Sequence, residues 1–184
     1  MQTRNSLRAQ LARAWERTII NQYNTQLINS ERGLQTYFCA ALLDEFKDKA
    51  RRLFIEPKLT FPSLSSGRHP DIVICNTKQI VGIVEIKYVP RGRPSYVKDL
   101  ETLRQAIDEP TELKLSNDRY RGIVSSNKSY ALAKDAVLCW AGVYAGEEIR
   151  LHSSVKSSSL SARLLQLSAL TAKYKDAKVV RRTK

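Results

Sequence analysis

The chain has 184 residues, and its 31 lysines and arginines against 18 aspartates and glutamates leave a net charge of +13. This length suits one domain with a normal core, and 7 glycines and 6 prolines are too few for a collagen-like or low-complexity chain. The longest apolar run, residues 136–145, is too short for a bilayer span, which needs about 20 residues. So positive a chain is typical of proteins that bind a polyanion, nucleic acid first and an anionic membrane surface second.

Apolar residues recur at helical spacing in the first part of the chain, which predicts helices over residues 6–28 and 31–54. Asn29 or Ser30 is placed to cap the second of them. The segment 58–61, bracketed by prolines, is predicted to be extended.

The pattern then changes to that of β structure. After a predicted loop over 63–67, the β-branched runs 71–75 and 80–89 flank a turn segment, 76–79, so the sequence predicts a β-hairpin.

Helical and apolar segments alternate in the second half of the chain. Ser95 is placed to cap a helix whose apolar side is formed by Val97, Leu100, Leu103 and Ile107, and Asp99 and Glu101 are expected on its exposed side. Residues 111–134 are polar, and they suit another hairpin or a loop. The rest is predicted as a buried strand (136–144), a second strand (149–155) and a helix (160–174).

Strands that alternate with helices predict an α/β domain of two or three layers around a mixed central sheet flanked by helices. We expect one domain over residues 1–184. Its parts are an N-terminal helix (1–28), a core (30–145), a C-terminal strand and helix (146–172) and a basic tail (173–184).

Two features of the sequence, its N-terminal segment and its cysteines, bear on where in the cell the protein is found. Residues 1–20 are rich in arginine and lack the apolar segment of a secretory signal; a basic amphipathic helix and a mitochondrial presequence both fit them. Cys39, Cys75 and Cys139 are far apart in apolar runs, so we interpret them as reduced core thiols and expect a cytoplasmic protein.

The predicted hairpin carries an unusual set of charges. Asp71 opens its first strand, and Glu85 and Lys87 lie on one face of the second, because residues two apart on a strand share a face. Charges on so apolar a strand are costly unless they pair or bind a ligand. Closing the hairpin brings Asp71 towards Glu85, and two converging carboxylates suit Mg²⁺ or Mn²⁺. The alternative is a simple surface ion pair of little energetic value.

Pro70-Asp71, a hairpin turn and Glu85-Ile86-Lys87 resemble the motif of the PD-(D/E)xK nuclease superfamily, which has the restriction-endonuclease-like fold. The resemblance implies Asp71 and Glu85 as metal ligands, the main-chain carbonyl of Ile86 as a further ligand, and Lys87 as the catalytic lysine.

The resemblance covers residues 30 to 145 and implies a helix, a three-stranded meander, a second helix and a further strand. Many members take another acid from the helix before the sheet, and Glu31 is the candidate here. The helix macrodipole alone also favours an acid at that position.

Basic residues near the motif suit a nucleic-acid backbone, and Tyr120 between two arginines offers a stacking surface. The candidates are Lys58, Arg68, Arg91, Arg93, Lys98, Arg119 and Arg121.

We therefore expect a nuclease that uses Mg²⁺ or Mn²⁺ to hydrolyse phosphodiester bonds in nucleic acid, DNA rather than RNA, with no membrane partner. One alternative is a non-catalytic nucleic-acid-binding or scaffold subunit with the same fold, and another is a basic protein that docks on acidic partners. A homodimer and a larger complex both remain open.

Overall fold

The computed structural model describes residues 2–47, 50–61, 64–109, 114–115, 128–155, 158–171 and 176–183. Within them, a mixed six-stranded sheet has the strand order β1-β4-β5-β8-β9-β10. β5, β8 and β9 run parallel, and the remaining neighbours pair antiparallel. The strands are β1 (Arg52–Ile55), β4 (Ile72–Cys75), β5 (Gln79–Val89), β8 (Ala131–Tyr144), β9 (Leu164–Leu170) and β10 (Lys178–Thr183).

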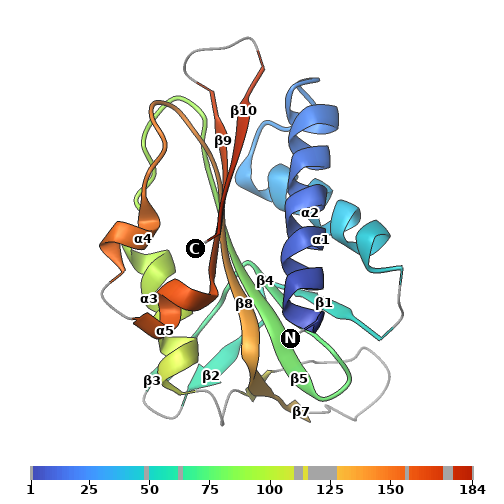
Figure 1. Ribbon diagram of the computed structural model, residues 1–184, viewed down its shortest axis with the longest axis vertical. Helices are drawn as coiled ribbons and strands as arrows, with labels where there is room; N and C mark the ends of the chain where they lie inside the picture. The colour runs from blue at the N-terminus through green and yellow to red at the C-terminus, as the bar shows by residue number, and fades with distance from the viewer. Residues whose placement is uncertain are drawn as a thin grey trace.

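Helices cover both faces of this sheet (Figure 1). On one side lie α1 (Gln2–Thr18), its π-helical continuation η1 (Ile19–Tyr23) and α2 (Glu31–Phe46), and on the other lie α3 (Val97–Asp108), α4 (Leu151–Ser154) and α5 (Ser158–Arg163). The prediction of an α/β fold with helices flanking a mixed sheet is confirmed.

The two cores arise from the alternation of side chains along each strand. Ile72 and Ile74 of β4 pack on the α1 and α2 side, whereas Val73 and Cys75 pack on the α3 side. Because both faces are covered, the central strands are apolar on both sides, as is usual for parallel strands under helices.

The β4–β5 hairpin forms as predicted, with Ile72 opposite Val84. Asn76 shapes its turn, because its Oδ1 accepts hydrogen bonds from the main-chain N–H groups of Lys78 (2.8 Å) and Gln79 (2.7 Å). This is the local bonding that favours asparagine in turns.

A second, smaller sheet has the order β3-β2-β6-β7. It contains β2 (Leu59–Phe61), β3 (Leu64–Arg68), β6 (Lys114–Leu115) and β7 (Lys128–Ser129). The extended segment 58–61 is confirmed as β2, but the predicted loop 63–67 is wrong, since residues 64–68 pair with β2. The serines and glycine of β3 have low strand propensity, so only this pairing makes it a strand.

The second predicted helix is too long. Ser30 caps α2 by accepting a hydrogen bond from Gly33 N at 3.1 Å, and the helix ends at Phe46 before a left-handed Lys47 (φ 42°). Residues 52–55 instead form β1 against β4. Leu53 and Phe54 fit the apolar spacing of a helix as well as that of a strand, and pairing with β4 makes this segment a strand.

The C-terminal predictions are also wrong in type. The predicted strand 149–155 contains the short helix α4, and the predicted helix 160–174 contains the end of α5 and then β9. Periodicity alone does not separate a short strand buried on both faces from a buried helix. The basic tail from residue 173 includes β10, which pairs with β9 along Lys178–Thr183.

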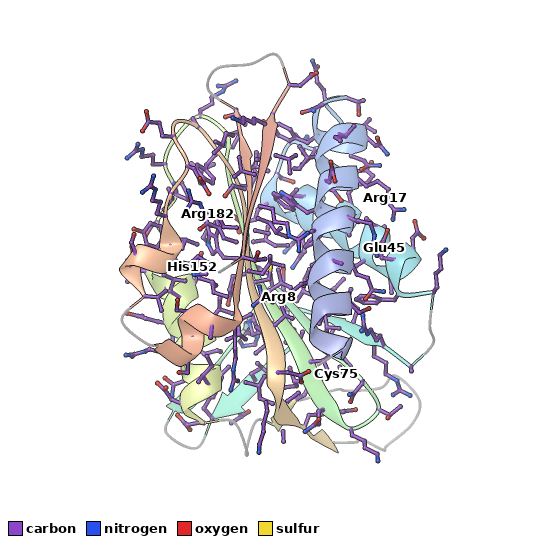
Figure 2. All side chains as sticks on the ribbon, viewed as in Figure 1. Arg8, Arg17, Glu45, Cys75, His152 and Arg182 are labelled. Carbon is purple, nitrogen blue, oxygen red and sulfur yellow. The ribbon has the colours of Figure 1, made fainter. Side chains whose placement is uncertain are left out.

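The N-terminal helix packs against the central sheet. Its apolar residues at steps of four, Leu7, Leu11, Trp15 and Ile19, are buried, whereas Leu27, in the same predicted helix, is exposed. Arg8 lies between α1 and the sheet, and its Nη1 donates to the carbonyl of Leu164 at 3.1 Å (Figure 2).

Helix α3 begins without the predicted cap. Tyr96, not Ser95, is its N-cap residue, and its side chain makes no capping hydrogen bond. All three cysteines are free and buried, as expected of core thiols. Among the described helices, none has the length and apolar character required to cross a membrane.

Candidate active site

The carboxylates of the motif lie where β5 extends beyond β4. The hairpin ladder ends at the Ile72–Val84 pair, so among the described strands β5 has no antiparallel neighbour past that point. The N–H groups of Ile86 and Tyr88 face this vacant edge, because residues two apart on a strand direct their N–H groups the same way. Each N–H donates to a carboxylate: Ile86 N to Asp71 Oδ2 at 2.5 Å and Tyr88 N to Glu31 Oε2 at 3.0 Å.

Asp71 is held at this edge from two sides. Its carbonyl accepts hydrogen bonds from Gln35 Nε2 of α2 at 3.0 Å and from the N–H of Glu56 at 2.9 Å. Glu31 is the first residue of α2, so the cap at Ser30 and the contact with Tyr88 place its carboxylate beside the same strand. The structure thus brings Glu31, Asp71 and Glu85 to one end of β5.

Glu85 is one of the two buried carboxyl groups at this end of β5, with 7% of its surface exposed. Burial, with the nearby charges of Asp71 and Asp99, raises the pKa of Glu85 to about 9, and the Glu85 side chain donates a hydrogen bond to Asp71. Burial also raises the pKa of Asp71 to about 6, although the N–H of Ile86 opposes the rise. The two carboxyl groups therefore retain a proton between them at neutral pH when no cation is near.

Lys87 has a buried acidic partner that sequence reasoning placed wrongly. Its Nζ lies 3.5 Å from Oδ1 of Asp99, whose Oδ2 accepts a hydrogen bond from Trp140 Nε1 at 3.0 Å. Burial lowers the pKa of Lys87, but Asp99, Glu31 and Asp71 outweigh this and raise it above its ordinary value. Lys87 is therefore an ammonium at neutral pH.

Asp99 is only 5% exposed, so its predicted place on the outer side of α3 is wrong. The buried side of α3 carries Leu103 and Ala106, whereas Val97, expected on that side, is 60% exposed. The spacing 99, 103, 106 is a helical stripe of its own, and an acid within such a stripe is the signal that could have identified Asp99.

The oxygen donors present are compatible with a hard divalent cation. Two carboxyl groups that share a proton, Asp71 and Glu85, together with the main-chain carbonyl of Ile86, have the chemistry that Mg²⁺ and Mn²⁺ prefer. In the part of the chain that the structure describes, however, no three His, Cys, Asp or Glu side chains are arranged to hold a metal ion. A bound cation would displace the proton that Asp71 and Glu85 share, because carboxylate ligands bind in the deprotonated form.

The predicted basic residues divide into two groups. Arg91 and Arg93 are exposed in the connection after β5, which is tied to the end of β8 by a 3.0 Å hydrogen bond from Ala145 N to Gly92 O. Lys98 is exposed on α3, next to Asp99 in the chain. The exposed Lys58 and the partly exposed Arg68 belong instead to the β2–β3 hairpin, where Leu59 is opposite Arg68. Arg119 and Arg121 lie outside the described residues, as does Tyr120.

A pocket of about 490 Å³ adjoins this end of β5, and sequence reasoning missed it. It is lined by Tyr23, Asn24, Gln26, Ile28, Asn29, Tyr88, Pro90 and Arg91. Tyr88 lines this pocket, and it also contacts the carboxylate cluster of Glu31, Asp71 and Glu85 through its N–H bond to Glu31.

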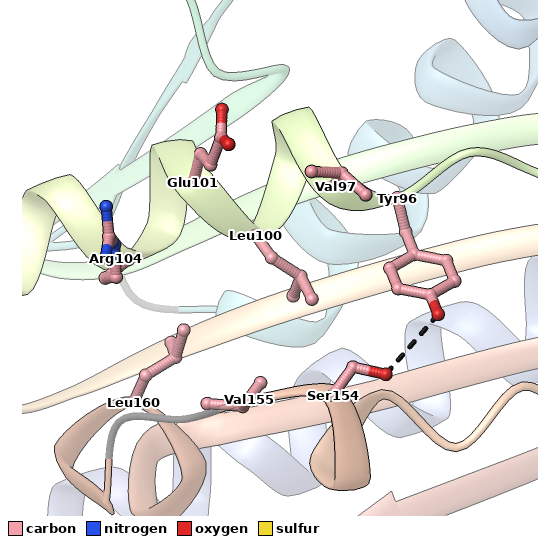
Figure 3. Close-up of a pocket in the computed structure, with 8 residues that line it drawn as sticks. All are labelled: Tyr96, Val97, Leu100, Glu101, Arg104, Ser154, Val155 and Leu160. Atoms are coloured by element: carbon pink, nitrogen blue, oxygen red, sulfur yellow. Dashed lines mark hydrogen bonds between the residues drawn. The ribbon is translucent and has the colours of Figure 1, made fainter.

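Another pocket of about 490 Å³ lies between α3 and the α4–α5 segment (Figure 3). Its lining is Tyr96, Val97, Leu100, Glu101, Arg104, Ser154, Val155 and Leu160, and the Tyr96 and Ser154 hydroxyl oxygens are 3.4 Å apart. With one carboxylate in its lining, this pocket lacks the paired acids found at β5.

The geometry at the end of β5 is thus the basis for any functional assignment. It places two carboxyl groups in contact, a third beside them and a lysine paired with a fourth. No protein-family model, curated protein or solved structure matches this chain.

Proposed function

We propose that this protein is a metal-dependent nuclease that hydrolyses phosphodiester bonds, in DNA rather than RNA. The observation that carries the proposal is the contact between the buried carboxyl group of Glu85 and the partly buried one of Asp71, with Lys87 on the same face of β5 as Glu85. In a chain of net charge +13, such acids would repel a bound phosphate unless a cation lay between them.

The order of elements supports a restriction-endonuclease-like core. α2 is followed by the antiparallel strands β1, β4 and β5, then by α3 and by β8 parallel to β5. This is the helix, meander, helix and strand that the motif's resemblance implies. The β2–β3 excursion and the strands β9 and β10 are additions to that plan.

In this proposal Asp71, Glu85 and the carbonyl of Ile86 hold Mg²⁺ or Mn²⁺. The cation supplies polarisation of the phosphate and an activated water. Lys87 places an ammonium against a phosphate oxygen or the attacking water, and Asp99 keeps that ammonium charged and in position. Trp140 in turn holds Asp99 through its indole N–H.

Glu31 has two roles open to it in this scheme. Its carboxylate accepts the N–H of Tyr88 and so closes the unpaired edge of β5, and its charge also adds to the negative potential around Asp71. The first role needs an acceptor oxygen only, whereas the second needs the charge.

A second candidate function is a non-catalytic nucleic-acid-binding or scaffold subunit. It is favoured by the partners that the acids have within the protein. Asp71 accepts the N–H of Ile86, Glu85 donates to Asp71, and Asp99 pairs with Lys87. A fold that uses its acids only to close a strand edge would need no cation.

Metal-dependent cleavage separates these functions. The purified protein is incubated with plasmid, single-stranded DNA and RNA in Mg²⁺, Mn²⁺ or EDTA. We expect DNA cleavage with either metal and none in EDTA. Nucleic-acid binding without cleavage under any condition would favour the scaffold subunit and reject the nuclease.

Isosteric variants test the acids themselves. Asp71→Asn and Glu85→Gln keep the shape and an acceptor oxygen, so the fold should persist, while cleavage should fall by about 10³-fold or more. Glu101→Gln, an exposed change on α3, is the matched control and should cleave normally. Full activity in either site variant would remove Asp71 or Glu85 from the metal site.

A further inference from the structure

The pocket beside the carboxylate cluster has a wall made by an irregular stretch of chain. Helix α1 continues into the π-helical turn η1, and Gln26 then adopts a left-handed backbone, φ 64°. π-helical turns occur frequently at functional sites, and a left-handed non-glycine residue carries a strain cost. These irregularities end the helix and place Tyr23, Asn24 and Gln26 along the pocket wall.

The opposite wall comes from β5 and the connection after it. Tyr88 and Tyr23 meet edge to face, with ring centroids 6.2 Å apart and ring planes at 73°. The Tyr88 hydroxyl donates to the carbonyl of Ile28 at 3.1 Å, which fixes the ring, while its main-chain N–H donates to Glu31. The same residue therefore joins the pocket to the candidate active site.

The lining combines amides, aromatic rings and one cation. Asn24 Oδ1 accepts a hydrogen bond from Ala177 N, which leaves its amide N–H groups as donors. Within the described part of the chain, the side-chain amides of Gln26 and Asn29 have no protein partner, and both residues are exposed. Arg91 is exposed at the rim.

These groups match the chemistry of a nucleobase. Amides supply the donors and acceptors that read the edge of an unpaired base, and a tyrosine ring offers a surface on which any base stacks. A guanidinium at the rim suits the phosphate of the same nucleotide. The volume of about 490 Å³ lies within the range of small-ligand pockets.

We infer that this pocket receives one unpaired nucleobase of the substrate strand, next to the phosphodiester that is cleaved. The inference rests on the proposed function and narrows it to single strands, overhangs or flaps. A base within a duplex would first have to be unpaired and unstacked, which costs free energy that a single-stranded substrate does not require.

Photocrosslinking tests the location of the base directly and needs no activity. A single-stranded oligonucleotide carrying one 5-iododeoxyuridine is irradiated with the full-length protein in Ca²⁺, and the modified peptide is identified by mass spectrometry. We expect the crosslink at Tyr23, Tyr88 or the 24–29 segment. Crosslinks confined to other parts of the chain, or none, would overturn the inference.

Affinity measurements test the contribution of the base. Fluorescence anisotropy compares a labelled seven-thymidine strand with an abasic strand of equal length and charge. The Gln26→Gly, Asn29→Ala double variant removes two amides, and glycine at position 26 relieves the left-handed strain, so the fold should be retained. We expect about a tenfold loss of affinity for the thymidine strand and no loss for the abasic strand.

Gln79→Ala is the matched control, because it removes an exposed amide at the opposite end of β5. It should leave both affinities unchanged. Equal loss for both strands in the double variant, or equal affinity of the unaltered protein for both strands, would overturn the inference.

The outcomes separate this inference from the proposed function. Metal-dependent cleavage without base selectivity would keep the nuclease and reject the base pocket. Selective binding and a crosslink in the pocket, without cleavage in any metal, would keep the base pocket and reject the nuclease.

Discussion

Between helices α1 and α2 the charged side chains form simple one-to-one ion pairs, whereas the end of β5 gathers acids around a single lysine. Between α1 and α2, Arg13 pairs with Glu45 at 2.8 Å and Arg17 with Asp44 at 3.1 Å. Arg13 and Asp44 are exposed and Arg17 and Glu45 are partly exposed, so water and salt screen both pairs, and each contributes little to stability.

The cluster at β5 has the opposite character. Four carboxyl groups act on or beside Lys87, two of them raised in pKa by burial and by mutual repulsion. They belong to Glu31, Asp71, Glu85 and Asp99. An excess of buried acid destabilises a folded chain, and such clusters of carboxyl groups with raised pKa values are more frequent at functional sites than elsewhere.

The largest expected effect within this comparison is at the lysine. Lys87→Arg conserves the charge but replaces a compact ammonium with a wide planar group, which would be misplaced against water or phosphate. Cleavage should fall by about 10²-fold or more, while DNA binding in Ca²⁺ changes little. Lys78→Arg, at the exposed turn of the β4–β5 hairpin, is the control. Near-normal cleavage by Lys87→Arg would show that Lys87 only balances charge.

The pH dependence of stability distinguishes the cluster from the surface pairs. The pKa of Glu85, about 9, and that of Asp71, about 6, are above the ordinary values of 4.5 and 3.8, so the folded state holds these protons more tightly than the unfolded state. Their contribution is complete below pH 4 and is lost as the pH rises through those values. With these pKa values, the free energy of unfolding of the metal-free protein should fall by about 5 kcal/mol between pH 5 and 8.

Glu85→Gln provides the control for that measurement, because it removes the more strongly shifted group. Urea unfolding of both proteins in EDTA gives the free energies. A pH dependence that is the same in Glu85→Gln would mean that the Glu85 carboxyl is not the source.

A smaller effect separates the two roles of Glu31. Glu31→Gln keeps an acceptor for the N–H of Tyr88 and removes the charge, whereas Glu31→Ala removes both. We expect the charge to matter, so both variants should lose about tenfold in cleavage, which corresponds to about 1.4 kcal/mol of the reaction barrier. Normal cleavage by Glu31→Gln and a lower melting temperature for Glu31→Ala would assign Glu31 to strand-edge closure alone.

The smallest effect is expected at the surface. Arg13→Ala removes one exposed partner of Glu45 and should change the free energy of unfolding by about 0.2–1 kcal/mol, less at high salt. Cleavage should be unaffected. A change of several kcal/mol would mean that the α1–α2 pairs are not simple surface ion pairs.

Sequence patterns were sufficient to predict the β4–β5 hairpin and the positions of Asp71, Glu85 and Lys87 on it. The alternation of Val84, Glu85, Ile86 and Lys87 assigns side chains to opposite faces, and Asn76 has the local bonding of a turn. The position of Asp71 beside Glu85 then follows from closing the hairpin.

Sequence patterns did not predict the burial of Asp99 or the pocket next to Tyr88. The buried side of α3 is decided by its packing on β8, so Asp99 points inward although a Val97–Leu100 stripe is equally regular in sequence. The pocket depends on a π-helical turn and on the meeting of residues 23–29 with 88–91, segments that are distant in the chain.

By itself, the sequence determined the features that arise from neighbouring residues: helix stripes, the turn at Asn76 and the shared face of Glu85 and Lys87. Tertiary structure alone decided whether the Leu164–Leu170 run is strand or helix, which side of α3 is buried, and which groups close the free edge of β5. The reason is physical. A short apolar run satisfies more than one local conformation, and an N–H at a strand edge accepts whichever partner packing brings to it, so both are settled by contacts between segments far apart in sequence.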